Sequence, residues 1–161
     1  MVFSCASSPD PQVPAVQEPV AAPAAEPKTG PEPAKITQEQ YVQTFSEVSA
    51  VINKLNGIIR AKNMREWESY LTPKFRETTM SPQNLSELNE TPLLKRNNIR
   101  IVTLKDYFDH VVVPSRANVR LDDLEFTDQN RVQAFMNVGR NESVLIYQLE
   151  KINNNWRISI W

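Results

Sequence analysis

Apolar residues recur along this chain with two spacings, one typical of helices and one typical of strands. Between Tyr41 and Ile59 they follow one another at intervals of three and four residues, which predicts a single amphipathic helix of about six turns. Thr37 and Gln40 stand where a capping box would start that helix. We therefore expect a long amino-terminal helix that runs from Thr37 to about Ala61.

Shorter helical segments follow the long one. Residues 64–75 repeat the helical spacing over a shorter span, and we expect Pro73 to end this second helix. Ser81 before Pro82 is a capping pattern for a third short helix. Residues 99–104 are rich in β-branched side chains and predict a strand.

The strand spacing dominates residues 118–161, where short polar turns separate runs of β-branched and aromatic residues. The turns are residues 127–130, 139–141 and 153–155. In the last run, Trp156, Ile158 and Ile160 share one face and Ser159 lies on the other, so one face must be covered by the helices. We expect an α+β fold, with a long amino-terminal helix and short helices packed on a curved antiparallel sheet of four strands.

Composition divides the chain into two parts. Residues 1–36 are rich in Pro, Ala and Glu and lack the aromatic side chains of a core, apart from Phe3, so we expect a disordered tether there. Residues 37–161 have the length of one α+β domain. The net charge of −1 gives no long-range field for nucleic acid, and we expect no nucleic-acid partner.

The single cysteine, Cys5, cannot form a disulfide within the chain. Ser4 before it and the small residues after it resemble the processing site of a bacterial lipoprotein, and Phe3 is similar to the relaxed sites of spirochaete-type lipoproteins. The resemblance implies acylation of Cys5, a membrane anchor, and a periplasmic or surface-facing place in the cell envelope. It also implies an apolar leader upstream of Met1. An unmodified cysteine in a disordered tail is the alternative.

The element order, the segment Trp67–Phe75 and the terminal segment Asn155–Ile158 resemble the SnoaL-like, nuclear-transport-factor-2-like superfamily. The resemblance implies a sheet that curls around the first helix into a cone with a pocket at its open end. Some members use this pocket as an enzyme active site, and others use the fold as a binding surface or dimer platform. A cystatin-like or lipocalin-like arrangement stays open as well, because fold alone does not choose a function.

Catalytic chemistry would have to come from residues 105–118, which hold the only histidine of the chain. Asp106 and His110 are four residues apart, so a helical turn would place them side by side for proton transfer, near Tyr107. An extended segment would separate them. We favour a non-catalytic reading, with a pocket enzyme for proton transfer or hydrolysis as the alternative.

Aromatic side chains could instead edge a modest pocket between the first helix and the sheet. The expected ligand-binding residues are Trp67, Tyr70, Tyr107, Phe108 and Tyr147. We expect a tethered domain that binds a small apolar ligand or a protein partner and needs no cofactor. A structural platform for a homodimer is a further alternative, formed by Phe135, Leu145 and Tyr147.

An acidic cluster is a candidate metal site. The acidic residues are Asp122, Asp123, Glu125 and Asp128. They lack the glycine-turned loop of a calcium site, and alternate residues of a strand diverge, so we expect a solvated face and no metal.

Basic residues form a candidate anion-binding patch at the rim of the sheet. They are Lys95, Arg96, Arg100, Arg116 and Arg120. They lack interleaved aromatic residues, and we expect them to serve solubility.

Overall fold

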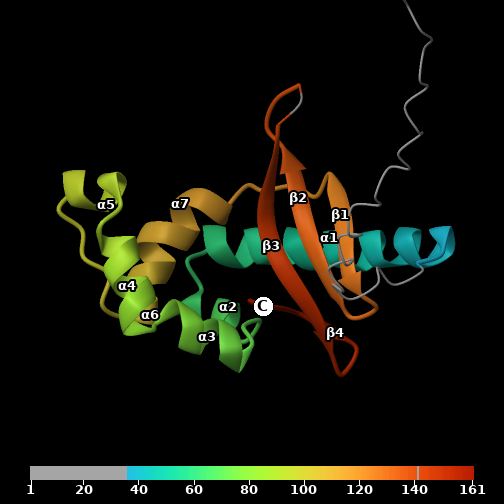
Figure 1. Cartoon of the computed structure of the whole chain (residues 1–161), viewed down its shortest axis with the longest axis horizontal. Coiled ribbons are helices and arrows are strands. Elements are labelled where there is room, and N and C mark those ends of the chain that lie inside the picture. Colours follow the sequence, from blue (N-terminus) through green and yellow to red (C-terminus); the bar gives the residue numbers. More distant parts are fainter. Residues whose placement is uncertain (1–35, 141) are drawn as a thin grey trace, which may run out of the picture. The chain divides into compact units, whose positions relative to one another are not determined.

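A computed structural model describes residues 36–140 and 142–161, so the amino-terminal arm with Cys5 lies outside the described residues. The helices precede all the strands (Figure 1). The helical elements are α1 (Gln38–Arg60), α2 (Met64–Glu68), α3 (Pro73–Thr79), α4 (Pro82–Asn89), α5 (Pro92–Arg96), α6 (Leu104–Tyr107), a π-helical turn η1 (Phe108–Val112) and α7 (Val113–Arg116). The strands are β1 (Asp123–Asp128), β2 (Arg131–Asn137), β3 (Ser143–Ile152) and β4 (Asn155–Ile158). The predicted α+β class is confirmed.

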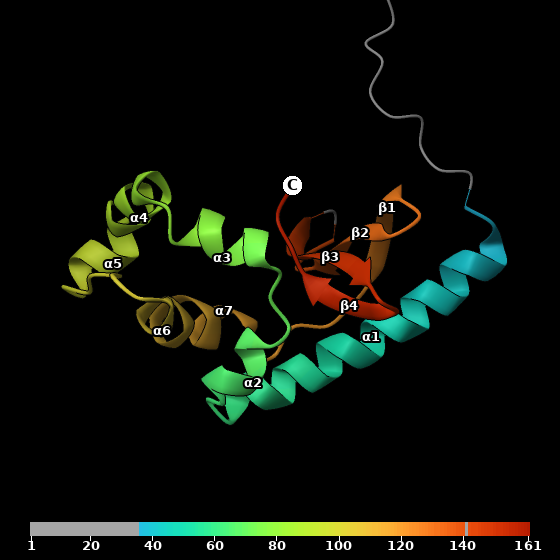
Figure 2. The ribbon, with the colours of Figure 1, turned by 90° about the horizontal axis from the view of Figure 1, so that it is seen from below.

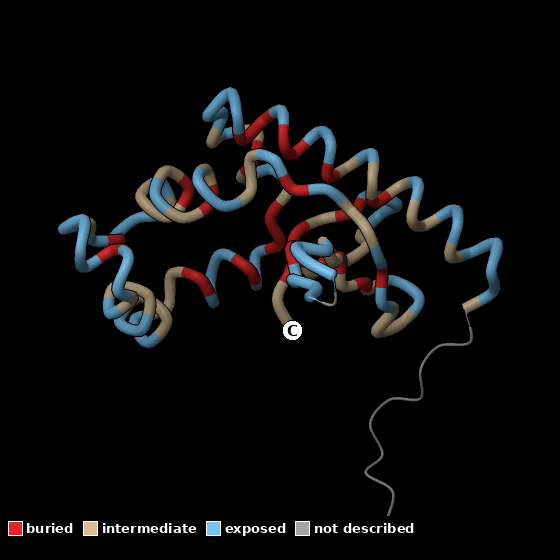
Figure 3. The backbone as a smooth tube through the Cα atoms, turned by 90° about the horizontal axis from the view of Figure 1, so that it is seen from above, coloured by how far each residue is buried: buried red, intermediate tan, exposed pale blue. Residues whose placement is uncertain are grey.

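Helix α1 begins as its sequence predicts. The Gln40 amide donates to the Thr37 hydroxyl at 3.2 Å, and the Thr37 amide donates to Oε1 of Gln40 at 2.9 Å, which completes the capping box. Buried positions recur along α1 between exposed ones (Figure 3), and Val48, Ile52 and Leu55 are at most 1% exposed. Within the described ranges, no helix is long and apolar enough to span a bilayer.

The four strands form an open antiparallel sheet in the order β1-β2-β3-β4, the meander that the turn spacing predicts. Helix α1 runs along one face of this sheet (Figures 1 and 2). Its apolar stripe joins one core cluster with Val132 of β2, Leu149 of β3 and Ile158 of β4. The remaining helices lie beyond the β3–β4 side of the sheet (Figure 2).

A β-bulge interrupts the alternation of β3. Ala134 pairs with Tyr147 whereas the next residue, Phe135, pairs with Leu145, so Ile146 is an extra residue in β3. Two successive side chains, Ile146 and Tyr147, are consequently both buried, at 4% and 6% exposure. Tyr147 therefore cannot belong to an exposed dimer platform with Phe135 and Leu145, and that part of the prediction is wrong.

The predicted strand at residues 99–104 is also wrong. This segment is not part of any sheet, because a side chain takes the place of a neighbouring strand. The Ile101 amide donates to Oδ1 of Asn89 at 2.7 Å, and Nδ2 of Asn89 donates to the Ile101 carbonyl at 2.9 Å. Both backbone groups of Ile101 are satisfied in this way without a β-ladder.

Pro73 starts helix α3 instead of ending the helix before it. Proline fits the first turn of a helix, where its missing amide hydrogen is not needed, and the Thr72 hydroxyl caps the turn. The chain leaves the helical path after α2 because it pairs with the edge of β4. The Ile158 amide donates to the Tyr70 carbonyl at 2.7 Å, and the Thr72 amide donates to the Ile158 carbonyl at 2.9 Å.

The same contact buries Ser159, which the alternation of the last strand places on the solvent side. Its side chain is 2% exposed. Its hydroxyl oxygen lies 3.2 Å from the Thr72 hydroxyl and 3.2 Å from Oε2 of Glu150, so its polar atom is satisfied by neighbours that are distant in sequence. The prediction of an exposed Ser159 is wrong for this reason.

Glu47 joins α1 to the last two strands. Its Oε2 atom accepts hydrogen bonds from Nζ of Lys151 at 2.7 Å and from Nε1 of Trp156 at 2.9 Å. The hydrogen bond from Lys151, followed by that from Trp156, holds the pKa of Glu47 below its ordinary value of 4.5. The ionised carboxylate therefore stabilises the docking of the helix on the sheet.

This coupling gives a pH-dependent stability. Because the pKa of Glu47 is lower in the folded than in the unfolded chain, its contribution is complete above the ordinary value of 4.5 and is lost as the pH falls through the lower folded-state pKa. Urea denaturation of wild type and Glu47→Gln should give a wild-type advantage at neutral pH that shrinks through that acidic range. Glu77→Gln, at an exposed position of α3, is the control and should show no such trend. A constant difference between wild type and Glu47→Gln at all pH values would contradict this account.

Candidate functional site

A cavity of about 380 Å³ lies between the sheet and the helices that follow α1. Its helical wall consists of Trp67, Phe75, Tyr107, Val111, Val112, Ser115 and Arg116. Its sheet wall consists of Leu145, Ile146, Tyr147, Gln148, Ile158, Ser159 and Ile160. None of these residues belongs to α1, so the cavity does not lie between the first helix and the sheet, where the sequence analysis expects a pocket.

Three of the five expected pocket residues, Trp67, Tyr107 and Tyr147, line this cavity. Phe108 is fully buried instead, with its ring centroid 4.9 Å from that of Trp67. Tyr70 lines a separate surface hollow beside β4. Whether the three lining aromatic residues bind a ligand stays a prediction.

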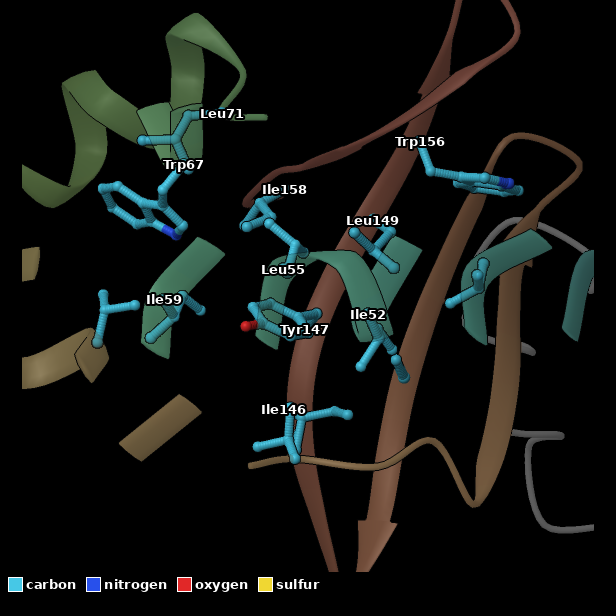
Figure 4. Packing of buried hydrophobic residues seen from close by; sticks show 14 of the residues in the cluster. Ile52, Leu55, Ile59, Trp67, Leu71, Ile146, Tyr147, Leu149, Trp156 and Ile158 are labelled. Carbon is cyan, nitrogen blue, oxygen red and sulfur yellow. The ribbon is translucent and has the colours of Figure 1, made fainter. Parts of the chain in front are cut away.

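Two polar groups of residues in the cavity wall have no hydrogen-bond partner within the part of the chain that the structure describes. They are Nε1 of Trp67 and the hydroxyl of Tyr147, whose side chains belong to residues only 1% and 6% exposed. Figure 4 shows the Trp67 ring nitrogen on the side that faces Tyr147, and the Tyr147 side chain pointing away from β3 with its hydroxyl toward the helices. A buried donor without a partner costs about 1–3 kcal/mol, and folded proteins keep few of them. Both atoms are enclosed by their neighbours, so the cavity is a candidate site because of its shape and its apolar wall.

Arg116 contributes a positive charge to the cavity wall. Its Nε atom donates to the Ile146 carbonyl, at the bulge, at 3.1 Å, and its Nη1 atom donates to the Ser115 carbonyl at 3.3 Å. Its Cζ atom lies 6.0 Å from the centre of the Tyr147 ring. Burial raises the pKa of Tyr147 and of Tyr107, although the charge of Arg116 opposes this, so both hydroxyls stay neutral at physiological pH.

The helix that lines the cavity is irregular at residues 108–116. Pro114 has no amide hydrogen to donate to the carbonyl four residues earlier, that of His110. The backbone forms the π-helical turn Phe108–Val112 there, and the amide of Val113 bonds to the Phe108 carbonyl, five residues back. The Ser115 hydroxyl donates to the Val111 carbonyl in the next turn. This irregular turn supplies Val111 and Val112 to the cavity wall.

The candidate catalytic residues do not converge on the cavity. The stretch is helical, but the Asp106 carboxylate caps α6 by accepting from the Thr103 amide at 2.8 Å and the Val102 amide at 3.1 Å. The hydrogen bond from the Thr103 hydroxyl is the largest cause of its lowered pKa. His110 is exposed, and no hydrogen bond joins it to Asp106 among the described residues. Only Tyr107 of the three lines the cavity.

Two members of the acidic cluster are held by contacts with neighbouring side chains. Asp122 pairs with Arg120 at 2.9 Å, and Oδ1 of Asp123 accepts from the Tyr41 hydroxyl at 2.8 Å. In residues 36–140 and 142–161, no group of three or more His, Cys, Asp or Glu side chains gathers around a common point that could hold a metal ion.

From the sequence, Arg116 is expected on a solvated basic patch, whereas the structure places it in the cavity wall. The residue depends on the Ile146 bulge for its backbone acceptor. A bulge leaves no signal in an alternation of apolar and polar residues. The Val-Pro-Ser segment before Arg116 is the sequence feature that could have indicated an irregular helix here, because proline within a helical stretch predicts a local irregularity.

The chain is similar to an uncharacterized lipoprotein of Treponema pallidum (strain Nichols), with 35% identity over 124 residues. The similarity covers 77% of this chain and 65% of that protein, so the chain spans less than two thirds of the length of this relative. No family model matches the chain. No solved structure matches it either, and the resemblance to SnoaL-like domains stays a prediction.

The unpartnered hydroxyl of Tyr147 gives a stability prediction. Tyr147→Phe removes a buried polar group that has no partner and keeps the ring, so it should raise the free energy of unfolding by about 1 kcal/mol. Tyr41→Phe is the matched control, because it removes a hydroxyl that donates to Asp123 at 2.8 Å and should lower the stability. Urea denaturation measures both. A Tyr147→Phe variant that is less stable than wild type would contradict the assignment of an unpartnered hydroxyl.

Proposed function

We propose that this chain is a lipid-anchored protein of the bacterial cell envelope whose α+β domain binds a small ligand in the cavity beside Tyr147. Two parts of the proposal rest on different observations. The anchor rests on Cys5 and on the relative from Treponema pallidum, and the binding role rests on the cavity.

The anchor is supported by two independent features. Cys5 stands among small residues that resemble a lipoprotein processing site. The Treponema pallidum relative, which is 35% identical, is itself described as a lipoprotein. A lipid on Cys5 would hold the domain at a membrane, and the Pro-rich residues that follow would serve as a spacer between the two.

The binding role is supported most directly by the size and the lining of the cavity. Its wall is mostly apolar, which is typical of small-molecule sites, and a volume of about 380 Å³ falls within their usual range of roughly 300–1,000 Å³. The geometry favours binding over catalysis because Asp106 and His110 lie outside this wall.

The cavity can be tested with a neutral fluorescent probe, N-phenyl-1-naphthylamine. We expect saturable binding to the full chain and a loss of binding in Val111→Trp, because the larger side chain fills the cavity from the helical wall. Val102→Trp is the control, since Val102 is 61% exposed and does not line the cavity. Circular dichroism checks that both variants fold. Unchanged probe affinity in a folded Val111→Trp variant would rule out this cavity as the site.

The anchor can be tested in the native host, with the gene expressed from its own locus. Metabolic labelling with an alkyne fatty acid should label the wild-type protein and place it in the detergent phase of a Triton X-114 partition. Cys5→Ser should abolish the label and move the protein to the aqueous phase, whereas Ser7→Ala should change neither. An unlabelled wild-type protein would refute the anchor and leave the cavity test unaffected.

A further inference from the structure

The charge in the cavity wall is unbalanced. Arg116 is the only charged side chain among the described residues that line it, and no Asp or Glu is present there. Its two hydrogen-bond acceptors, the carbonyls of Ile146 and Ser115, are neutral. By contrast, Arg120 and Arg131 pair with carboxylates on the surface of the sheet. The cavity wall thus carries a net positive charge beside apolar side chains, which favours an anionic ligand over a cationic one.

The guanidinium group is also held in place before any ligand arrives. The bulge directs the Ile146 carbonyl to Nε of Arg116, so the side chain loses little further freedom on binding. No hydrogen bond of Nη2 is present among the described residues. A guanidinium that is fixed at one edge and free at another can bind an oxyanion with defined geometry.

The guanidinium group also sets the kind of atom that it can bind. It carries only hydrogen-bond donors, so a ligand that meets it must supply acceptors. Its Cζ atom lies 6.0 Å from the centre of the Tyr147 ring, whose apolar face borders the charge. Nε1 of Trp67 and the Tyr147 hydroxyl are enclosed by their neighbours and take no part in this contact.

We propose that the cavity binds an amphiphile that consists of an alkyl chain and a single carboxylate, with the carboxylate bound by Arg116. This inference rests on the proposed function and specifies the ligand of the same site. One arginine balances one negative charge, which suits a carboxylate better than a phosphate dianion. The alkyl chain would lie against the apolar wall that includes Val111, Leu145 and Ile160.

The test compares decanoate with decanol, which differ in the charged head group. The affinity of each amphiphile is measured by its displacement of N-phenyl-1-naphthylamine at neutral pH. The protein is the full chain with Cys5→Ser, which cannot be lipidated. We expect decanoate to bind about tenfold more tightly than decanol, because a hydrogen bond to a charged group contributes more than one to a neutral group. Equal affinity for the two would overturn the inference and leave the proposed function standing, because the alcohol would still occupy the cavity.

Substitutions of Arg116 test whether this residue causes the preference for decanoate over decanol. Arg116→Gln should weaken decanoate binding about tenfold and leave decanol within about twofold, and Arg116→Lys should restore part of the loss. Arg100→Gln, at an exposed position away from the cavity, is the control and should change neither affinity. A decanoate preference that survives in Arg116→Gln would overturn the inference.

Two measurements guard against a loss of folding in Arg116→Gln. Circular dichroism checks the helical content of the variant, and decanol binding checks that its cavity is intact. A variant with the wild-type spectrum and the wild-type decanol affinity is folded, so its weaker decanoate binding cannot come from unfolding. Failure of both amphiphiles to displace the probe would overturn the inference, whereas failure of the probe itself to bind would refute the proposed function.

Discussion

The burial of the apolar stripe of α1 against one face of the sheet is the constraint on which this structure depends. Neither element can leave its apolar side in water, and each provides the cover that the other needs. Val48, Ile52, Leu55 and Ile59 of α1 are at most 1% exposed. The ion pair of Glu47 with Lys151 makes this packing specific, because it fixes the position of α1 relative to β3.

The cavity forms where this regular packing ends. Two irregularities meet there, the Ile146 bulge of β3 and the π-helical turn Phe108–Val112. The bulge turns both Ile146 and Tyr147 inward and presents a backbone carbonyl to Arg116. Bulges and π-helical turns are frequent at functional sites because they redirect side chains that a regular element would space evenly. In this protein both of them shape the wall of one cavity.

The side chains around the cavity carry local costs to stability. A fold selected only for stability would replace the buried hydroxyl of Tyr147 with a phenylalanine ring, and it would pair Arg116 with a carboxylate. Among the described residues, the chain instead keeps an unpartnered hydroxyl, an unpartnered indole N–H and an unbalanced charge in this region. The proposed binding role would account for the unbalanced charge, because functional sites are where proteins retain such costs.

The sequence by itself determined the features that depend on near neighbours. The capping box of Thr37 and Gln40, the apolar stripe of α1 and the turns of the meander all follow from residues a few positions apart, and each was predicted. Only the tertiary structure decided the path of residues 99–104, the break of the helical path after α2 and the burial of Ser159. Each of these depends on a partner at least nine residues away, such as Asn89 for Ile101 or Ile158 for Tyr70. The cavity belongs to the second group, because its walls come from segments up to 93 residues apart, from Trp67 to Ile160, which only the folded chain brings together.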